Sequence, residues 1–195
     1  MASSETVFGL RVKNIVARYF MGAITKEINR YEMIQALKGV RALQPSFAGS
    51  TKGASGDEKA KKNARVYGSS IFAICPRGNA HAETYRGYMG SKNGAIPVTI
   101  MREEEWEAMF AHLDIEPPWL RADDTDGAIA IMRNLMERES HKIPALQRDV
   151  LDWWDAILPE IRKNIDESVG YCREFWARAD QLGVKRDNIY CTAPD

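Results

Sequence analysis

The sequence predicts an α+β protein, in which a small antiparallel sheet in the N-terminal half is packed against or followed by a mainly helical C-terminal half. Short runs of β-branched and aromatic residues occur before residue 101. After it, apolar residues recur at spacings of three or four, the period of an amphipathic helix. Glycine-rich polar stretches separate the runs of the N-terminal half, and we interpret them as loops.

Three segments carry strand patterns. Residues 8–12 alternate apolar and polar side chains, which is typical of a half-buried strand. Residues 66–75 (VYGSSIFAIC) form the strongest strand candidate, ending at Pro76. Residues 96–100 (IPVTI) predict a short strand, in which Pro97 lies at an edge of the sheet or at the start of the strand, because proline has no N–H for a central ladder.

Four segments carry helix patterns. Thr25 can cap a helix that continues to Leu43. Trp106, Met109, Phe110 and Leu113 form one apolar stripe, and a second stripe follows a cap at residues 124–126. The last pattern extends from Leu146 to Leu182, as one helix or two, since Pro159 must kink it or start a new helix.

With 195 residues, the chain is long enough for one domain with a sizeable core. We expect a basic α+β half at residues 1–100, with flexible loops at 45–64 and 76–95. An acidic helical half follows at 101–195. The two halves are expected to fold as one cooperative unit.

The formal net charge of zero conceals two opposed halves. Residues 1–100 contain 15 Lys or Arg and 6 Asp or Glu, whereas residues 101–195 contain 12 and 21. A basic region of this kind attracts phosphate backbones or acidic protein surfaces. Equally, the halves could pack together and neutralise each other, since charge counts do not fix geometry.

We expect a cytoplasmic protein without a membrane anchor. No apolar run approaches the roughly 18 residues of a membrane span, and the first ten residues lack the pattern of a signal peptide. The three cysteines are widely spaced and odd in number, which favours reduced thiols.

One short fragment suggests catalysis. His81-Ala82-Glu83 resembles the His-x-Glu motif of zinc-dependent cytidine and adenosine deaminases. The zinc shell of those enzymes also needs Cys-x-x-Cys, which this chain lacks. No phosphate-binding glycine motif or His-Glu-x-x-His occurs either. The sequence therefore predicts no catalytic residues, no metal site and no cofactor, and an enzyme acting through His81 and Glu83 stays an alternative.

A more coherent pattern interleaves cations and aromatic rings over residues 77–92, and a basic cluster at residues 59–65, before the strand at 66–75, is interpreted as part of the same surface. Glycine allows close backbone approach, tyrosine can stack on a base and arginine can pair with phosphate. A connecting loop whose tyrosines fold back onto the core would show the same pattern. The candidate nucleic-acid-binding residues are Lys59, Lys61, Lys62, Arg65, Arg77, Tyr85, Arg86, Tyr88 and Lys92.

The acidic half offers candidates for binding a protein partner. Carboxylates gather in residues 103–105 and 123–126, and tryptophan is enriched at interface hot spots. Core packing is the competing interpretation for the tryptophans. The candidate partner-binding residues are Glu103, Glu104, Glu105, Trp119, Asp123, Asp124 and Trp154.

These patterns favour a non-enzymatic binding or assembly protein, a subunit or inhibitor of a nucleoprotein complex. Its partner would be nucleic acid or an acidic or basic protein surface. A protein-interaction module that uses the acidic helical half is the alternative.

Overall fold

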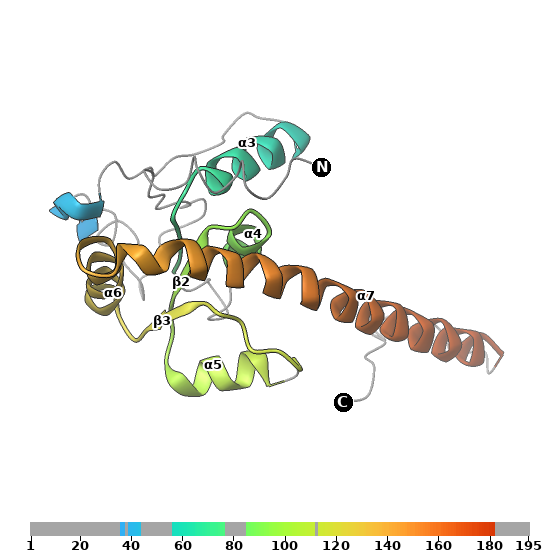
Figure 1. Cartoon of the computed structure of the whole chain (residues 1–195). Coiled ribbons are helices and arrows are strands. Elements are labelled where there is room, and N and C mark those ends of the chain that lie inside the picture. The colour runs from blue at the N-terminus through green and yellow to red at the C-terminus, as the bar shows by residue number, and fades with distance from the viewer. Residues whose placement is uncertain (1–35, 38, 44–55, 77–84, 112, 182–195) are drawn as a thin grey trace. The chain divides into compact units, whose positions relative to one another are not determined.

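The computed structural model describes residues 36–37, 39–43, 56–76, 85–111 and 113–181. Helices account for most of these residues (Figure 1). The chain divides into two compact units, Met1–Trp154 and Asp155–Asp195. The sheet and the helices that pack on it belong to the first unit.

The sheet has three strands, all parallel. They are β1 (Phe72–Cys75), β2 (Ile96–Ile100) and β3 (Leu120–Ala122), in the spatial order β1-β2-β3. Phe72 lies opposite Ile96, and Val98 lies opposite Leu120. The prediction of a small antiparallel sheet confined to the N-terminal half is therefore wrong.

The connections between strands explain the parallel arrangement. Helix α4 (Tyr85–Lys92) lies between β1 and β2, and α5 (Glu103–Phe110) lies between β2 and β3. A helix in the connection returns the chain to the edge where the previous strand began, so the next strand runs parallel to it. The predicted loop at 76–95 thus contains a helix.

The predicted loop at 45–64 also ends in a helix. Helix α3 (Gly56–Gly68) extends beyond that loop into the segment expected to be a strand from residue 66. Asp57 and Glu58 occupy its first turn and Arg65 its last, an order that suits the helix dipole. Asn63 and Tyr67, four residues apart, form its buried side.

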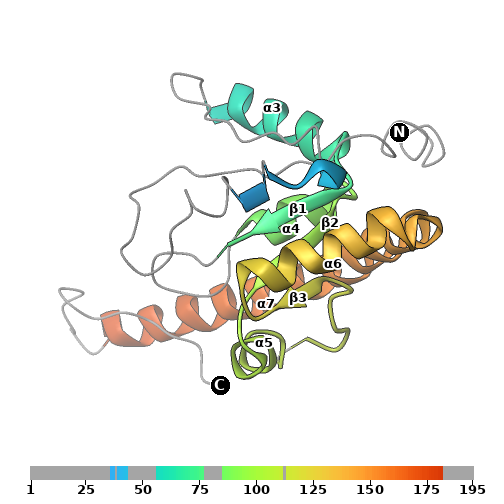
Figure 2. The ribbon, with the colours of Figure 1, turned by 90° about the vertical axis from the view of Figure 1, so that its left-hand side faces the viewer.

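The two faces of the sheet pack against different helices. Helix α6 (Thr125–Glu137) lies on the face of Phe72 and Val98, with Met132 fully buried there. Side chains alternate along a strand, so Ala73 belongs to the opposite face, where it packs with Met89 of α4. Figure 1 shows α6 and α4 on opposite sides of the strands, and Figure 2 views the sheet from the α6 side.

Strand β2 has the predicted bounds and is the central strand of the sheet, so Pro97 lies at the start of a strand and not at an edge, the second of the two predicted positions. Its proline is tolerated because β3 is short: β3 pairs only with residues 98–100 of β2. At Pro97 there is no β3 ladder to lose a hydrogen bond, while Ile96 donates to Ile71 at 2.8 Å just before β1. At Pro97, β2 thus has a strand on one side only.

Helix α4 depends on glycine at both its packing face and its end. A Cβ at Gly87 would lie 2.4 Å from Cη2 of Trp119, and one at Gly90 would lie 2.7 Å from Cβ of Ala73. Gly94 ends the helix with φ 70°, and the next residue, Ala95, donates back to the Gly90 carbonyl at 3.0 Å. The glycines thus belong to a closely packed helix.

The predicted helices of the second half are present. Helix α5 ends at Phe110, before Leu113 of the first predicted stripe, and α6 contains the whole of the second. The Asp124 side chain caps α6 by accepting a 2.7 Å hydrogen bond from the Gly127 amide. Helix α7 (Ile143–Gln181) is continuous, with Pro159 inside it. The predicted strand at 8–12 and most of the predicted helix at 25–43 lie outside the described residues.

An aromatic cluster joins α4, α5 and α7 on one face of the sheet. Trp119 is its centre, with ring centroids at 5.3 Å from Tyr88, 5.2 Å from Phe110 and 5.5 Å from Trp153. Its indole N–H donates to the Ser91 hydroxyl at 2.8 Å. Trp153 donates to the Ile115 carbonyl at 3.0 Å. Both buried indoles therefore have hydrogen-bond acceptors, as buried polar groups require.

The cysteines differ from one another. Cys75 is a buried thiol in β1, as expected for a reduced cysteine. Cys172 is disulfide-bonded, so the expectation of reduced thiols is wrong for that residue.

Candidate nucleic-acid interface

Helix α3 carries a row of exposed cations. Lys61 and Arg65 are four residues apart, Lys62 and Arg65 are three apart, and all three side chains are exposed. Such spacings place side chains on one side of a helix. Among the described residues, no ion pair involves any of the three. We call Lys61, Lys62 and Arg65 the α3 basic row. Lys59 belongs to the same helix, but its side chain lies outside what the structure describes.

Helix α4 begins and ends with exposed side chains of the predicted set. Tyr85, its first residue, is 55% exposed, and Lys92, its last residue, is exposed as well. A span of eight helical residues is about 12 Å long at 1.5 Å per residue. The exposed ring and the exposed ammonium therefore mark the two ends of a short helix.

Helices α3 and α4 are neighbours. Tyr67 of α3 and Met89 of α4 belong to one apolar cluster that also contains Ala73 of β1. The α3 basic row thus lies on an element packed directly against α4, and the sheet supports both. Figures 1 and 2 show the two helices close together.

Two other members of the predicted set are not surface groups. Tyr88 is half-buried and its ring stacks at 6.5 Å from that of Trp153, so it belongs to the aromatic cluster. Arg86 is only 4% exposed. Arg77, His81 and Glu83 lie outside the described residues.

The environment of Arg86 is unusual for a charged side chain. Its Cζ lies 5.1 Å from the centroid of the Tyr85 ring, a cation–π arrangement. Its Nε is buried without a hydrogen-bond partner. In the described part of the chain, no acceptor is hydrogen-bonded to the guanidinium and no carboxylate is paired with it.

The predicted acidic residues have structural partners instead. Arg121 forms ion pairs with Glu103 and, at 2.7 Å, with Asp123, and it donates to the Met101 carbonyl at 3.2 Å. These contacts tie the start of α5 to the end of β3. Glu105 accepts from the Arg102 amide at 3.0 Å in a capping box.

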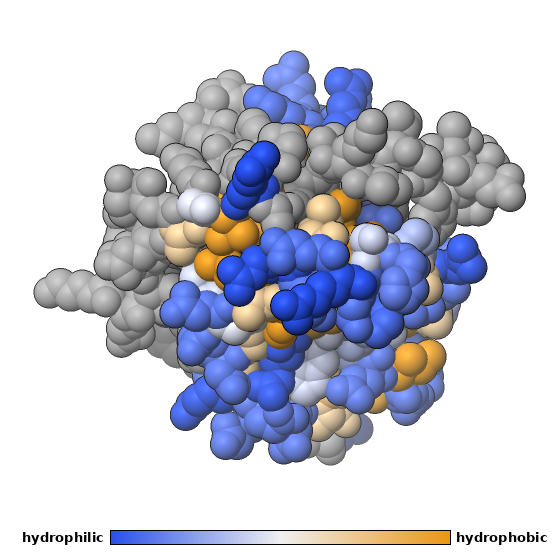
Figure 3. Space-filling model, turned by 60° about the vertical axis from the view of Figure 1, so that its left-hand side comes forward, coloured by the Kyte–Doolittle hydropathy of each residue, from blue (hydrophilic) through white to orange (hydrophobic). Residues whose placement is uncertain are grey.

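Among the remaining partner-binding candidates, Asp124 caps α6 and Glu104 is exposed. Trp119 is 7% exposed, so its ring has no surface to offer a protein partner. Trp154 is half-buried. The described surface seen in Figure 3 is mostly hydrophilic, with smaller hydrophobic areas between polar residues.

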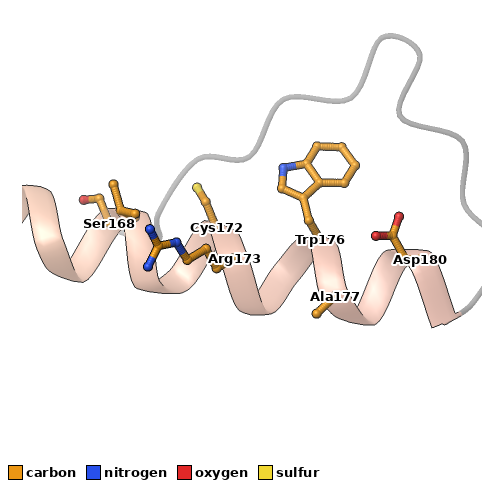
Figure 4. Close-up of a pocket in the computed structure, with 7 residues that line it drawn as sticks. Ser168, Cys172, Arg173, Trp176, Ala177 and Asp180 are labelled. Atoms are coloured by element: carbon orange, nitrogen blue, oxygen red, sulfur yellow. The ribbon is translucent and has the colours of Figure 1, made fainter.

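A concavity of about 570 Å³ lies along the second half of α7. All of its described lining residues come from that one helix, and Figure 4 shows Cys172, Trp176 and Asp180 projecting from the same side of it. Arg173 and Asp180 accompany mainly apolar surface in this lining. We assign no chemistry to this concavity.

The described residues hold no group of three or more His, Cys, Asp or Glu side chains placed to bind a metal ion. Nor does any helix in the described ranges have the length and apolarity needed to cross a membrane.

The sequence signal that could have revealed α3 is the order of its charges, with acidic residues in the first turn and basic residues after them.

Comparisons with known proteins identify no relative. No family model matches the chain, and no curated protein or solved structure matches it.

Proposed function

We propose that this protein is a non-enzymatic nucleic-acid-binding protein, part of a nucleoprotein assembly, which binds a single strand across α3 and α4. The observation that carries the proposal is the α3 basic row, three exposed cations without an ion pair among the described residues. The carboxylates of Glu103 and Asp123 are by contrast paired with Arg121. A cytoplasmic location belongs to the same proposal.

Electrostatics supports the use of α3. Cations on one side of a helix can each neutralise a phosphate, and the released counterions make binding depend on salt. The row is mounted on a helix whose buried side, Asn63 and Tyr67, is fixed against the core. A strand would therefore meet cations whose backbone positions are fixed by a packed helix.

The exposed ring of Tyr85 favours a single strand over a duplex. Bases of an unpaired strand can stack on an aromatic side chain, whereas bases inside a duplex are already stacked. With 55% of its surface exposed, Tyr85 can offer such a face while its other side lies against the Arg86 guanidinium. Lys92 adds a cation at the far end of the same helix.

The test measures binding of labelled single-stranded DNA and RNA of about 20 nucleotides as the salt concentration is raised. The variant is Lys61→Gln, Lys62→Gln and Arg65→Gln together. For single strands each neutralised phosphate contributes about 0.7 to the slope of log K against log salt, so the variant should lose about 2 units of slope. At about 0.1 M salt this corresponds to roughly 100-fold weaker binding.

The matched control removes three exposed cations elsewhere, by Arg133→Gln, Arg162→Gln and Arg178→Gln, with the same change in net charge. It should weaken binding much less. No detectable binding by the native chain at about 50 mM salt, or equal losses in the two variants, would refute the proposal.

A second pair of variants tests stacking. Tyr85→Ala should weaken single-strand binding by about 1–3 kcal/mol, and Tyr85→Phe should retain most of the affinity, because phenylalanine keeps the ring. If both variants lose affinity equally, or neither does, Tyr85 does not stack on a base.

A further inference from the structure

We propose that Arg86 and the N-terminal turn of α4 form a binding site for a phosphate monoester group, of the kind carried by a nucleoside monophosphate. The inference goes beyond strand binding by the α3 basic row and does not need it, since a small phosphate ester would satisfy the site alone.

Arg86 is a buried arginine that forms no ion pair within the described part of the chain. A guanidinium has five N–H donors and stays protonated, and arginine is almost never fully buried unless it is paired. Arg86 is 4% exposed, and its Nε has no hydrogen-bond partner. The Tyr85 ring, 5.1 Å from Cζ, attracts the cation but is no substitute for an anionic acceptor. The side chain is therefore placed for an anion that comes from outside.

Arg86 lies in the first turn of its helix. It is the second residue of α4, which follows the carboxyl end of β1 in the parallel sheet. The first N–H groups of a helix have no intrahelical acceptor and form the positive end of its dipole. The first turn of α4 holds no acidic residue that would neutralise this charge. The free backbone donors and the residue that carries the guanidinium thus belong to the same helix turn.

A phosphate monoester has the shape and the acceptors that match these donors. Phosphate suits helix N-termini, and arginine pairs with its oxygens through two parallel hydrogen bonds. A phosphate monoester has three terminal oxygens, enough to accept from both the guanidinium and the helix amides. With 4% of Arg86 exposed, a small terminal group can approach it more easily than an internal phosphodiester between two nucleosides.

The exposed ring beside the guanidinium suggests what the phosphate carries. Tyr85 is 55% exposed, so a flat base attached to the bound phosphate has an aromatic surface on which to stack. Stacking on one ring should make adenosine monophosphate bind about 5- to 150-fold more tightly than inorganic phosphate.

The first test is thermal denaturation with inorganic phosphate and with adenosine monophosphate. At about 100 times the dissociation constant, either ligand should raise Tm of the native chain by about 5–10 °C. Arg86→Met keeps a long side chain without the charge. It should abolish the shift, and its ligand-free Tm should equal or exceed that of the native chain, because an unpaired buried charge has been removed.

A ligand-induced shift that persists in Arg86→Met, or no shift in the native chain, would overturn the proposal. Since a variant can fail to fold, a second measurement uses the native chain alone. Amide NMR resonances of Arg86, Gly87 and Tyr88 should move on addition of inorganic phosphate, while those of Glu103–Glu105, at the start of α5, should not. Equal movement at both helices, or none, would also overturn it.

Oligonucleotides with a 5′-phosphate and with a 5′-hydroxyl distinguish the sources of the phosphate. A preference for the phosphorylated strand that Arg86→Met removes assigns the site to strand ends. Binding of adenosine monophosphate without such a preference assigns it to free nucleotides, and both results support the phosphate site. The triple variant of the α3 basic row should keep this binding, so either proposal can fail without the other.

Discussion

Replacing Gly87 by alanine should destabilise the protein, although alanine is the better helix former. An added Cβ would lie 2.4 and 2.5 Å from Cη2 and Cζ3 of Trp119 and 3.0 Å from Cζ2. Carbon atoms in contact are normally about 3.5–4.0 Å apart, so the overlap is on the order of an ångström. The backbone of α4 and the indole ring would have to move apart.

The indole has little room to retreat. Its N–H is hydrogen-bonded to Ser91, and its ring lies against Tyr88, Phe110 and Trp153. Overpacking a site of this kind costs about 1–3 kcal/mol or somewhat more, against a gain of about 1 kcal/mol in helix propensity. Because the ring cannot retreat, we expect the upper end of that cost, about 3 kcal/mol, and hence a net loss of about 2 kcal/mol, which lowers Tm by about 4–8 °C in a chain of this size.

Thermal and urea denaturation followed by circular dichroism would measure the change. Gly170→Ala is the matched control, since Gly170 lies inside α7 and a Cβ there meets no atom within 4 Å. It should stabilise its helix by up to about 1 kcal/mol. In a chain that also carries Trp119→Leu, the smaller leucine leaves room for the added Cβ, so Gly87→Ala should cost less stability there than in the native chain. A Gly87→Ala protein that melts at or above the native Tm would refute the close packing of α4 on Trp119.

Two further changes test local structure. Asp124→Ala removes the α6 cap, whose carboxylate accepts from the Gly127 amide at 2.7 Å, and should cost about 1 kcal/mol in urea denaturation; an unchanged midpoint would contradict this role. A hydrogen bond from Lys142 lowers the pKa of Glu139, so Lys142→Gln should raise that pKa in an NMR titration. Because the folded pKa is lowered, the stabilisation is present above the unfolded pKa and is lost as pH falls through the folded pKa. If the pKa of Glu139 is the same in the variant as in the native chain, the contact is disproved.

The sequence predicted the elements whose signals are local. The bounds of β2 follow from the apolar run at 96–100, and α6 follows from its apolar stripe and the Asp124 cap. Helix α5 follows from the stripe of Trp106 and Phe110. Each pattern depends on residues within one or two turns, so no tertiary contact is needed to read it.

Helix α4 could not be predicted in this way. Gly87 and Gly90 are poor helix formers, so residues 85–92 resemble a loop. The tertiary structure explains them, because Trp119 and Ala73 leave no space for a Cβ at either position. Because residues 76–95 were predicted to be a loop, the sequence showed no helical crossover between β1 and β2, and the strands were predicted to be antiparallel.

The candidate sites show the same difference between local sequence signals and tertiary contacts. The sequence by itself determined which cations and rings the chain offers, and the placement of Lys61, Lys62 and Arg65 on one exposed side follows once α3 is known. Only the tertiary structure decided that Trp119 and Tyr88 pack in an aromatic cluster, and that Arg86 is buried with its Nε unpaired. Burial depends on residues distant in the chain, such as Trp153 beside Tyr88, and no local pattern encodes those contacts.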